Sequence, residues 1–60
     1  MKYQYRIIEH DKFTGRDTTV AHYSDIDLAM REVDAIRSAM SPRHRVRYGH
    51  EVVKEEVRRG

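Results

Sequence analysis

The sequence contains no cysteine, so no disulfide can brace the fold, and the commonest zinc sites are excluded. It also lacks any apolar run approaching the roughly 18 residues that a membrane-spanning helix needs. Its first residues contain no apolar stretch that resembles a signal peptide. We therefore expect no membrane span and, as the absence of cysteine allows, a cytoplasmic location.

The chain is short and mostly polar. Sixty residues allow one domain at most, with marginal stability that self-association would supplement. Hydrophobic residues make up 38% and charged residues 37%, yet the formal net charge is only +2, which argues against a disordered chain. Residues 1–42 carry six Lys or Arg against seven Asp or Glu, whereas residues 43–60 carry six against three. The basic C-terminal third is the first indication of function.

The first 23 residues predict a β-hairpin. Residues 3–10 and 17–23 are rich in aromatic and β-branched residues, as strands are. Between them, Asp11 opens and Gly15 closes a short polar stretch that suits a turn with a left-handed glycine. In the register expected from this turn, His10 faces Asp17 and His22 faces Tyr5.

Residues 25–40 predict a helix. Ser24 is a preferred N-cap, Asp27 stands three residues later, and Tyr23 and Leu28 occupy the positions of a hydrophobic staple. The helix should end before Pro42, because the residue before proline disfavours helical angles. Apolar residues recur at helical spacing and form one stripe for the core: Ile26, Ala29, Met30, Val33, Ile36 and Met40.

The segment after Pro42 alternates again and predicts a third strand over residues 44–53. His44, Val46 and Tyr48 fall on one side of it, and the arginines fall on the other. Gly49 marks a bulge or a tight turn, so residues 51–57 either continue the strand, fold back or form a helical tail.

These elements predict an α+β domain of ββαβ type over residues 1–57, followed by a frayed tail at 58–60. Its three-stranded, mainly antiparallel sheet would have the order 2-1-3, with one helix packed on one face. The face toward the helix would present Tyr5, Ile7, Val20, Val46 and Tyr48. The open face would present Lys2, Gln4, Arg6, Ile8, Thr19, Ala21, Arg45 and Arg47. An inverted strand phase would instead turn the tyrosines outward.

No residue pattern points to catalysis, to a metal or to a cofactor. Ser24 is assigned to the helix cap, and Ser38 and Ser41 lack a recognisable base or oxyanion loop. The four histidines have neither the helical spacing nor the clustering of metal ligands. No glycine-rich phosphate loop is present. We therefore expect a non-enzymatic protein without cofactor or metal.

Three surfaces are candidates for binding: basic residues, an apolar strip on the helix, and the two open edges of the sheet. Basic side chains of the predicted open face and of the C-terminal third are the candidates for contact with a partner or with nucleic acid: Lys2, Arg6, Arg43, Arg45, Arg47, Lys54, Arg58 and Arg59. The alternative interpretation is an ordinary solvated face whose charges block edge pairing. On the helix, Leu28, Ala35 and Ala39 fall opposite the main stripe and form a narrow apolar strip. This strip and the two open sheet edges would suit a homodimer or a partner contact. The alternative is purely structural: Leu28 forms the hydrophobic staple with Tyr23, and the alanines are present because alanine favours helix.

The run from Tyr3 to Ala29 resembles the hairpin and helix of the arm-type DNA-binding domains of tyrosine recombinases. The features are aromatic residues in the first strand, the Thr14-Gly15-Arg16 turn and Tyr23-Ser24 before the helix. Those domains place three strands before their helix, whereas this chain offers two.

Two functions remain open at this point. The first is a small accessory protein that binds and modulates a larger protein or protein–nucleic-acid assembly, of the kind of phage or mobile-element inhibitors and adaptors that act on nucleic-acid or defence machinery. The second is direct DNA or RNA binding through the Arg-rich third strand and the open sheet face. A third interpretation is a structural module whose only role is dimerisation.

Overall fold

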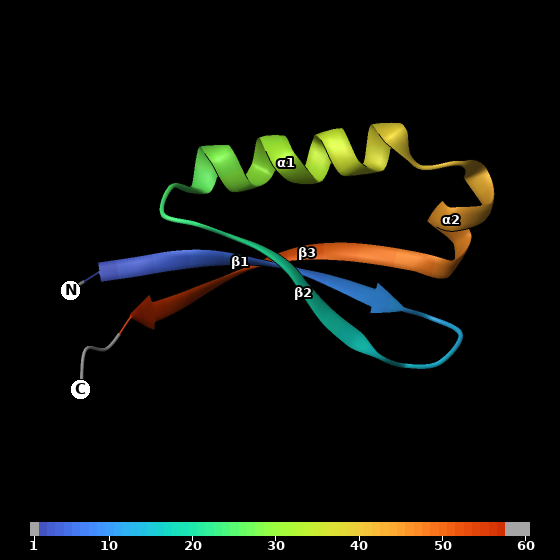
Figure 1. The fold of residues 1–60 in the computed structure, drawn as a ribbon, viewed down its shortest axis with the longest axis horizontal. Helices are drawn as coiled ribbons and strands as arrows, with labels where there is room; N and C mark the ends of the chain where they lie inside the picture. The colour runs from blue at the N-terminus through green and yellow to red at the C-terminus, as the bar shows by residue number, and fades with distance from the viewer. Residues whose placement is uncertain (1, 58–60) are drawn as a thin grey trace.

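The computed structural model describes residues 2–57, which form a three-stranded sheet with one long helix along one face (Figure 1). The elements follow in the order β1 (Lys2–Asp11), β2 (Asp17–Tyr23), α1 (Ile26–Ala39), α2 (Pro42–Arg47) and β3 (Tyr48–Val57). The sheet order is β2-β1-β3, and both outer strands run antiparallel to β1. The α+β class, the strand order and the packed helix are confirmed. The short helix α2 is an addition that the sequence interpretation missed.

The hairpin turn forms as its residues predict. The Asp11 carbonyl accepts the Gly15 N–H at 2.7 Å, and the Asp11 side-chain Oδ1 accepts the Phe13 N–H at 3.0 Å. Gly15 has φ +76°, a left-handed conformation that side chains with a Cβ rarely adopt. Asp11 and Gly15 therefore close the turn through local chemistry that can be read from the sequence.

A β-bulge shifts the hairpin register beyond the turn. His10 lies opposite Asp17, as predicted, but the register changes between Ile7 and Ile8. From there His22 lies opposite Arg6, so the predicted pairing of His22 with Tyr5 was wrong. A bulge inserts one extra residue into one strand and offsets every later pair.

The bulge also changes which side chains of β2 lie under α1. Val20 is the extra residue, and it is exposed, where the uniform register predicted it beneath the helix. Ala21 pairs with Ile7 and shares its face, whereas it was predicted on the open face. A slip of one residue moves a side chain to the opposite face of a sheet, which is why both predictions were wrong together.

The third strand begins later than predicted and runs further. It spans Tyr48–Val57 rather than residues 44–53, and residues 42–47 form α2. Ser41 caps α2 by accepting the His44 N–H at 3.4 Å, and Pro42 stands in the first turn, where its fixed φ suits a helix. These local signals outweigh the alternation of residues 43–47. Val46 is therefore exposed on α2 instead of packing beneath α1.

Both ends of α1 are closed by side chains. Asp25 is the N-cap, and its carboxylate accepts the Asp27 N–H at 2.7 Å; the predicted cap, Ser24, lies one residue too early. The helix ends before Pro42, as expected. At this end the Arg37 carbonyl accepts Nε and Nη2 of Arg45 at 3.1 and 2.7 Å, so α2 is tied to the C-terminus of α1.

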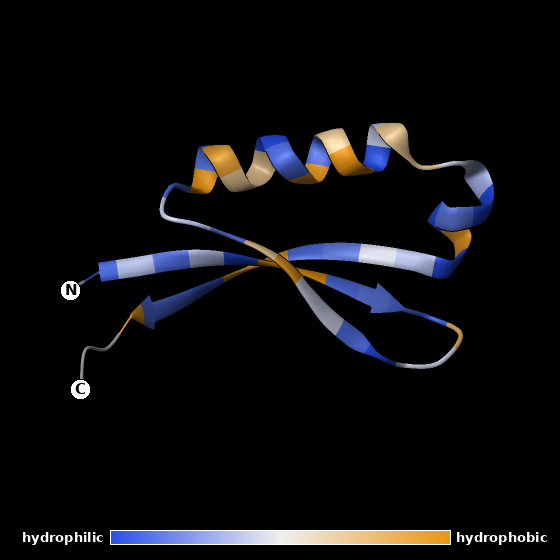
Figure 2. Cartoon of the chain, viewed as in Figure 1, coloured by the Kyte–Doolittle hydropathy of each residue, from blue (hydrophilic) through white to orange (hydrophobic). Residues whose placement is uncertain are grey.

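The core between α1 and the sheet is thin. Ile7 and Ala29 are the only fully buried hydrophobic residues among residues 2–57. Figure 2 shows apolar residues in the middle of the strands, where these pass beneath α1, and more polar colours over much of the strand ends. The predicted helix stripe faces this core through Ala29 and the half-buried Val33, Ile36 and Met40. Ile26 and Met30, also assigned to the stripe, are exposed at its border.

On the face opposite α1, here called the open face, one histidine joins all three strands. His10 of β1 approaches Asp17 of β2 at 2.5 Å through Nδ1, and Glu51 of β3 at 2.7 Å through Nε2. Hydrogen bonds to Asp17 and then to Glu51 raise the pKa of His10 above its usual 6.5, because both carboxylates favour the imidazolium. This clamp stabilises the fold fully below pH of about 6.5, and its contribution is lost as pH rises through the raised pKa.

Replacing Ile7 tests which face α1 covers. We expect Ile7→Ala to lower the free energy of unfolding by about 2–5 kcal/mol, because it empties a fully buried site. That is a large part of the roughly 3–9 kcal/mol expected for 60 residues. The neighbour Ile8 is half-buried on the open face, and we expect Ile8→Ala to cost about 1 kcal/mol. Urea unfolding followed by circular dichroism measures both losses, and a larger loss for Ile8→Ala would contradict the assignment of faces.

Candidate functional site

The β1–β2 turn and α2 meet at one end of the molecule, on the right in Figure 1. The Lys12 N–H donates to the Arg47 carbonyl at 2.7 Å, so the backbones of the turn and of α2 are joined directly. Asp11, the last residue of β1, pairs with Tyr48, the first residue of β3. Side chains from segments more than 30 positions apart are thereby brought together.

An ion pair fixes the centre of this end. Arg47 donates from Nε to Asp11 Oδ1 at 3.2 Å and from Nη2 to Oδ2 at 3.0 Å. These bonds are the main reason that the pKa of Asp11 falls from 3.8 to about 2, and they raise the pKa of Arg47. The guanidinium carbon also lies 5.3 Å from the centre of the Phe13 ring and 5.2 Å from that of Tyr48. Arg47 is thus held in place by one carboxylate and two rings.

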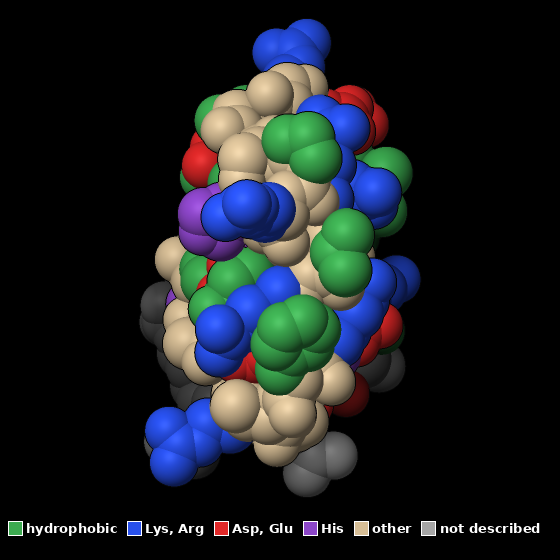
Figure 3. Space-filling model, turned by 90° about the vertical axis from the view of Figure 1, so that its right-hand side faces the viewer, with side chains coloured by type: hydrophobic (Ala, Val, Ile, Leu, Met, Phe, Trp, Pro, Cys, Tyr) green, Lys and Arg blue, Asp and Glu red, His purple; other side chains and the backbone are tan. Residues whose placement is uncertain are grey.

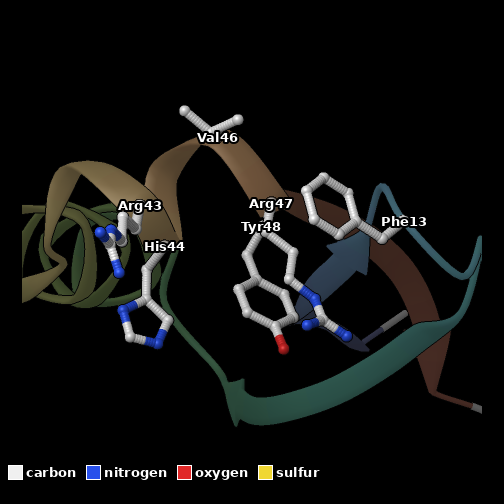
Figure 4. A pocket seen from close by; sticks show the side chains of 6 residues that line it. All are labelled: Phe13, Arg43, His44, Val46, Arg47 and Tyr48. Carbon is white, nitrogen blue, oxygen red and sulfur yellow. The ribbon is translucent and has the colours of Figure 1, made fainter.

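Around Arg47 the surface forms a hollow of about 510 Å³. In Figure 4 the Arg47 side chain runs between those of Tyr48 and Phe13, and Val46 projects from α2 in the direction away from His44 and Tyr48. Phe13 is 70% exposed and Val46 is 66% exposed, the two highest values among the large apolar side chains of residues 2–57. The lining of this hollow, here called the α2 hollow, consists of Phe13, Arg43, His44, Val46, Arg47 and Tyr48.

His44 and Tyr48 form one side of the hollow, and contacts of His44 fix their positions. Its ring stacks on Tyr48 with 6.0 Å between centres and 19° between planes. Its Nδ1 lies 2.8 Å from Ser41 Oγ, within the cap of α2. His44 and Tyr48 are therefore positioned by the same short helix that exposes Val46.

Positive charge gathers at this end. Residues 11–17 and 41–49 together hold five Lys or Arg against two Asp, a formal net charge of +3. The rest of the described chain holds five against eight Asp or Glu, a net of −3. Figure 3, which views this side of the molecule, shows hydrophobic side chains interspersed with Lys and Arg, and Asp and Glu mainly toward the margins. The hollow thus combines exposed apolar surface with a cationic surround.

Three of the predicted binding residues lie together, but not where they were predicted. Arg43, Arg45 and Arg47 stand on α2 and not on the third strand, because residues 42–47 are helical. Arg45 is engaged with the Arg37 carbonyl and Arg47 with Asp11. Arg43 is exposed and lines the hollow.

The other predicted basic residues do not join this group. Lys2 begins β1, about 30 Å along the strand from Asp11. Arg6 lies on the open face with Nη1 3.8 Å from Glu55 Oε2, and Lys54 lies 4.2 Å from the Tyr3 ring centre. Arg58 and Arg59 lie outside the described residues, as does the predicted tail 58–60.

The open face is not the basic surface that was predicted. Arg45 and Arg47 are absent from it because they belong to α2. β3 instead contributes Glu51 and Glu55, which contact His10 and Gln4 respectively. Acidic side chains from β3 therefore offset the basic residues of β1.

The apolar strip on α1 is present. Leu28, Ala35 and Ala39 are all exposed, and Leu28 keeps 48% of its surface accessible. β2 and β3 form the two edges of the sheet. Both features agree with the surfaces expected from the helical period and the strand order.

Sequence reasoning missed the apolar part of the α2 hollow. Phe13 was read as part of a polar turn, and Val46 as a core residue. Two signals were available: a lone aromatic residue in an otherwise polar turn, and the Ser41-Pro42 pair, which is a frequent helix start.

Among residues 2–57, no group of three or more His, Asp or Glu side chains is arranged to hold a metal ion. Neither helix has the length and apolar character needed to cross a membrane. No family model, curated protein or solved structure was found to match the chain.

Acid titration tests the Asp11–Arg47 pair. The folded-state pKa of Asp11, about 2, lies below its usual 3.8, so the pair stabilises the fold above pH 3.8. That contribution is lost as pH falls toward 2. We expect Asp11→Asn, which keeps the turn acceptor, to be less stable than the wild type at pH 6, and the difference to shrink between pH 4 and pH 2. Urea unfolding at each pH measures it. Asp34→Asn, an exposed carboxylate of α1, is the matched control; a constant offset for Asp11→Asn would contradict the assigned role.

Proposed function

We propose that this chain is a small non-enzymatic accessory protein that docks on a larger macromolecular partner and modulates it. The observation that supports this most directly is the α2 hollow, where Phe13 and Val46 expose most of their apolar surface beside Arg43. Apolar and aromatic groups together with arginine are enriched in the central parts of protein interfaces.

The extent of the molecular surface supports a binding role. The chain exposes 4868 Å², whereas a monomer of 7.2 kDa is expected to expose about 4100 Å². The radius of gyration is 12.7 Å, against about 10.4 Å expected for 60 residues. A thin, elongated body of this kind gains stability when a partner covers part of it.

One pair in the described chain has the spacing of a nucleophile and its base, but its role in the proposed function is structural. Ser41 Oγ and His44 Nδ1 are 2.8 Å apart, but the same Oγ caps α2 by accepting the His44 N–H. Both residues are exposed, and among residues 2–57 no carboxylate hydrogen-bonds to the other ring nitrogen of His44 to orient it. A hydrolytic triad requires that third group and a site shielded from water.

The proposed modulation follows from charge. A cationic, partly apolar end can occupy the acidic or substrate-bearing surface of a nucleic-acid-processing enzyme, which is how a small phage or mobile-element inhibitor or adaptor would act in the cytoplasm. Direct binding of DNA or RNA is the second candidate, and the net charge of +3 at this end favours it.

Partner capture tests the docking function. We expect the wild-type chain, immobilised, to retain a defined macromolecule from lysate of cells that produce it. The doubly substituted Phe13→Ser, Val46→Ser chain should retain at most about a tenth as much, because burial of two large apolar groups is lost. The control is Val57→Ser, an exposed apolar residue near the opposite end of the sheet. Equal capture by all three chains, measured by quantitative mass spectrometry, would refute docking through the α2 hollow.

Self-association through α1 is part of the proposal. The exposed strip of Leu28, Ala35 and Ala39 combines one large and two small side chains, which lets two helices approach closely. A second copy packed there would cover apolar surface that the thin core leaves exposed.

Light scattering tests this interface. We expect the wild type to have the mass of a dimer at high protein concentration and Leu28→Asp that of a monomer. An acidic residue in the first turns of a helix is favourable to the helix dipole, so the fold should survive. Met30→Asp, exposed on the opposite flank of α1, is the control and should stay dimeric. A Leu28→Asp mass equal to that of the wild type would exclude this strip.

A further inference from the structure

We propose that the α2 hollow binds an acidic protein segment. One large apolar side chain of that segment would insert into the hollow, and Asp or Glu residues before and after it in the segment would lie near the Lys and Arg residues around the hollow. This inference rests on the proposed docking function and names the chemistry of the partner that the hollow accepts.

The apolar side chain is assigned to the space between Phe13 and Val46. Phe13 projects from the hairpin turn and Val46 from α2 (Figure 4). The hollow is therefore lined by two separate elements of the fold. Its volume of about 510 Å³ falls within the range of small-molecule sites and exceeds that of a single leucine or phenylalanine side chain. A partner residue inserted here would remove both walls from water, as the central residues of interfaces do.

The acidic flanks are assigned from charge. None of the six residues that line the hollow is acidic. Arg43 is exposed at its border, and Lys12 and Arg16 are exposed in the adjoining turn. The nearest carboxylate, Asp11, is already bound by Arg47. A partner with carboxylates therefore meets complementary charge, while a basic partner meets repulsion.

The same geometry favours protein over nucleic acid. Single-stranded nucleic acid binds by stacking bases on free aromatic faces. Here the Arg47 guanidinium lies against the rings of Phe13 and Tyr48, and His44 stacks on Tyr48, so a base would have to compete with these groups for the ring faces. Val46, the other exposed wall, is aliphatic. Two of the three arginines of α2 are also engaged within the chain, which leaves few guanidinium groups for phosphates.

Titration of the isotope-labelled full chain with short synthetic peptides tests the inference. One peptide carries a central leucine between Asp and Glu residues, a second replaces the leucine by serine, and a third keeps leucine but has lysine flanks. Oligothymidylate is the nucleic-acid probe. We expect the acidic leucine peptide to bind saturably and to shift amide signals of Phe13, Val46 and Tyr48. The serine peptide and the lysine-flanked peptide should each bind at least about tenfold more weakly.

Variants of the protein locate the contacts. Val46→Ser should weaken the acidic leucine peptide about tenfold and leave the already weak serine peptide unchanged, because only the apolar contact is lost. Arg43→Glu should weaken both acidic peptides, with the larger effect at low salt. Arg31→Glu is the matched control, since it reverses the same charge on the exposed surface of α1 and should change neither affinity.

Two results would overturn the inference: equal affinity for the leucine and serine peptides, or tighter binding of oligothymidylate than of any acidic peptide. These outcomes are separable from failure of the docking function. If a cellular partner is captured through Phe13 and Val46 but no acidic peptide binds, docking stands and the assigned chemistry fails. If acidic peptides bind the hollow but no captured partner depends on it, the chemistry stands and the docking function fails.

Discussion

The bidentate pair between Asp11 and Arg47 is the interaction on which this end of the molecule depends. Asp11 closes the hairpin turn through its side chain, ends β1 and lies opposite the first residue of β3. Arg47 is the last residue of α2 and lies over two aromatic rings. The pair therefore connects the turn, α2 and both long strands, and it holds the walls of the α2 hollow at a set separation. Without it, α2 would be attached by the Arg45 contact, by ring contacts of Arg47 and His44, and by backbone hydrogen bonds.

Polar contacts of this kind matter because the core is small. Only Ile7 and Ala29 are fully buried hydrophobic residues in the described chain, and no cysteine is present to brace it. His10 spans the three strands on the open face, and His50, whose side chain is 1% exposed, meets Glu9 at 3.1 Å on the helix side. Such contacts specify register and alignment more than they add stability. The thin core leaves large apolar side chains exposed, and these are the groups that the proposed docking function would cover.

The placement of charge follows from one local competition. Arginine alternates with other residues over positions 43–47, as side chains of one face do in a strand. From this alternation alone, the arginines were predicted on one face of the sheet. Ser41 and Pro42 start a helix instead. A helical turn with an N-cap and a proline at its first position is stabilised by local contacts, whereas a strand needs hydrogen bonds to another strand far away in the chain. The outcome moves three arginines from the sheet to one end, exposes Val46 and leaves the open face with acidic residues from β3. The candidate site thus exists because of a short helix and not because of the sheet.

Much of the fold was determined by the sequence itself, because the deciding chemistry is local. Asp11 and Gly15 specify the turn, the apolar stripe specifies α1, and the order of elements restricts the sheet to β2-β1-β3. The exposed apolar strip on α1 could also be predicted, since Leu28, Ala35 and Ala39 follow the helical period.

Only the tertiary structure decided the rest. The bulge at Val20 depends on how β2 meets β1 and α1, and the start of β3 depends on the competition just described. The α2 hollow unites Phe13 with Val46, which are 33 positions apart in the chain and have no shared local pattern. The absence of cysteine showed that no disulfide could link distant segments. In the structure, ion pairs such as Asp11–Arg47 and His10–Glu51 link segments that are far apart in the chain. Contacts between distant segments are set by packing, and no local periodicity encodes them.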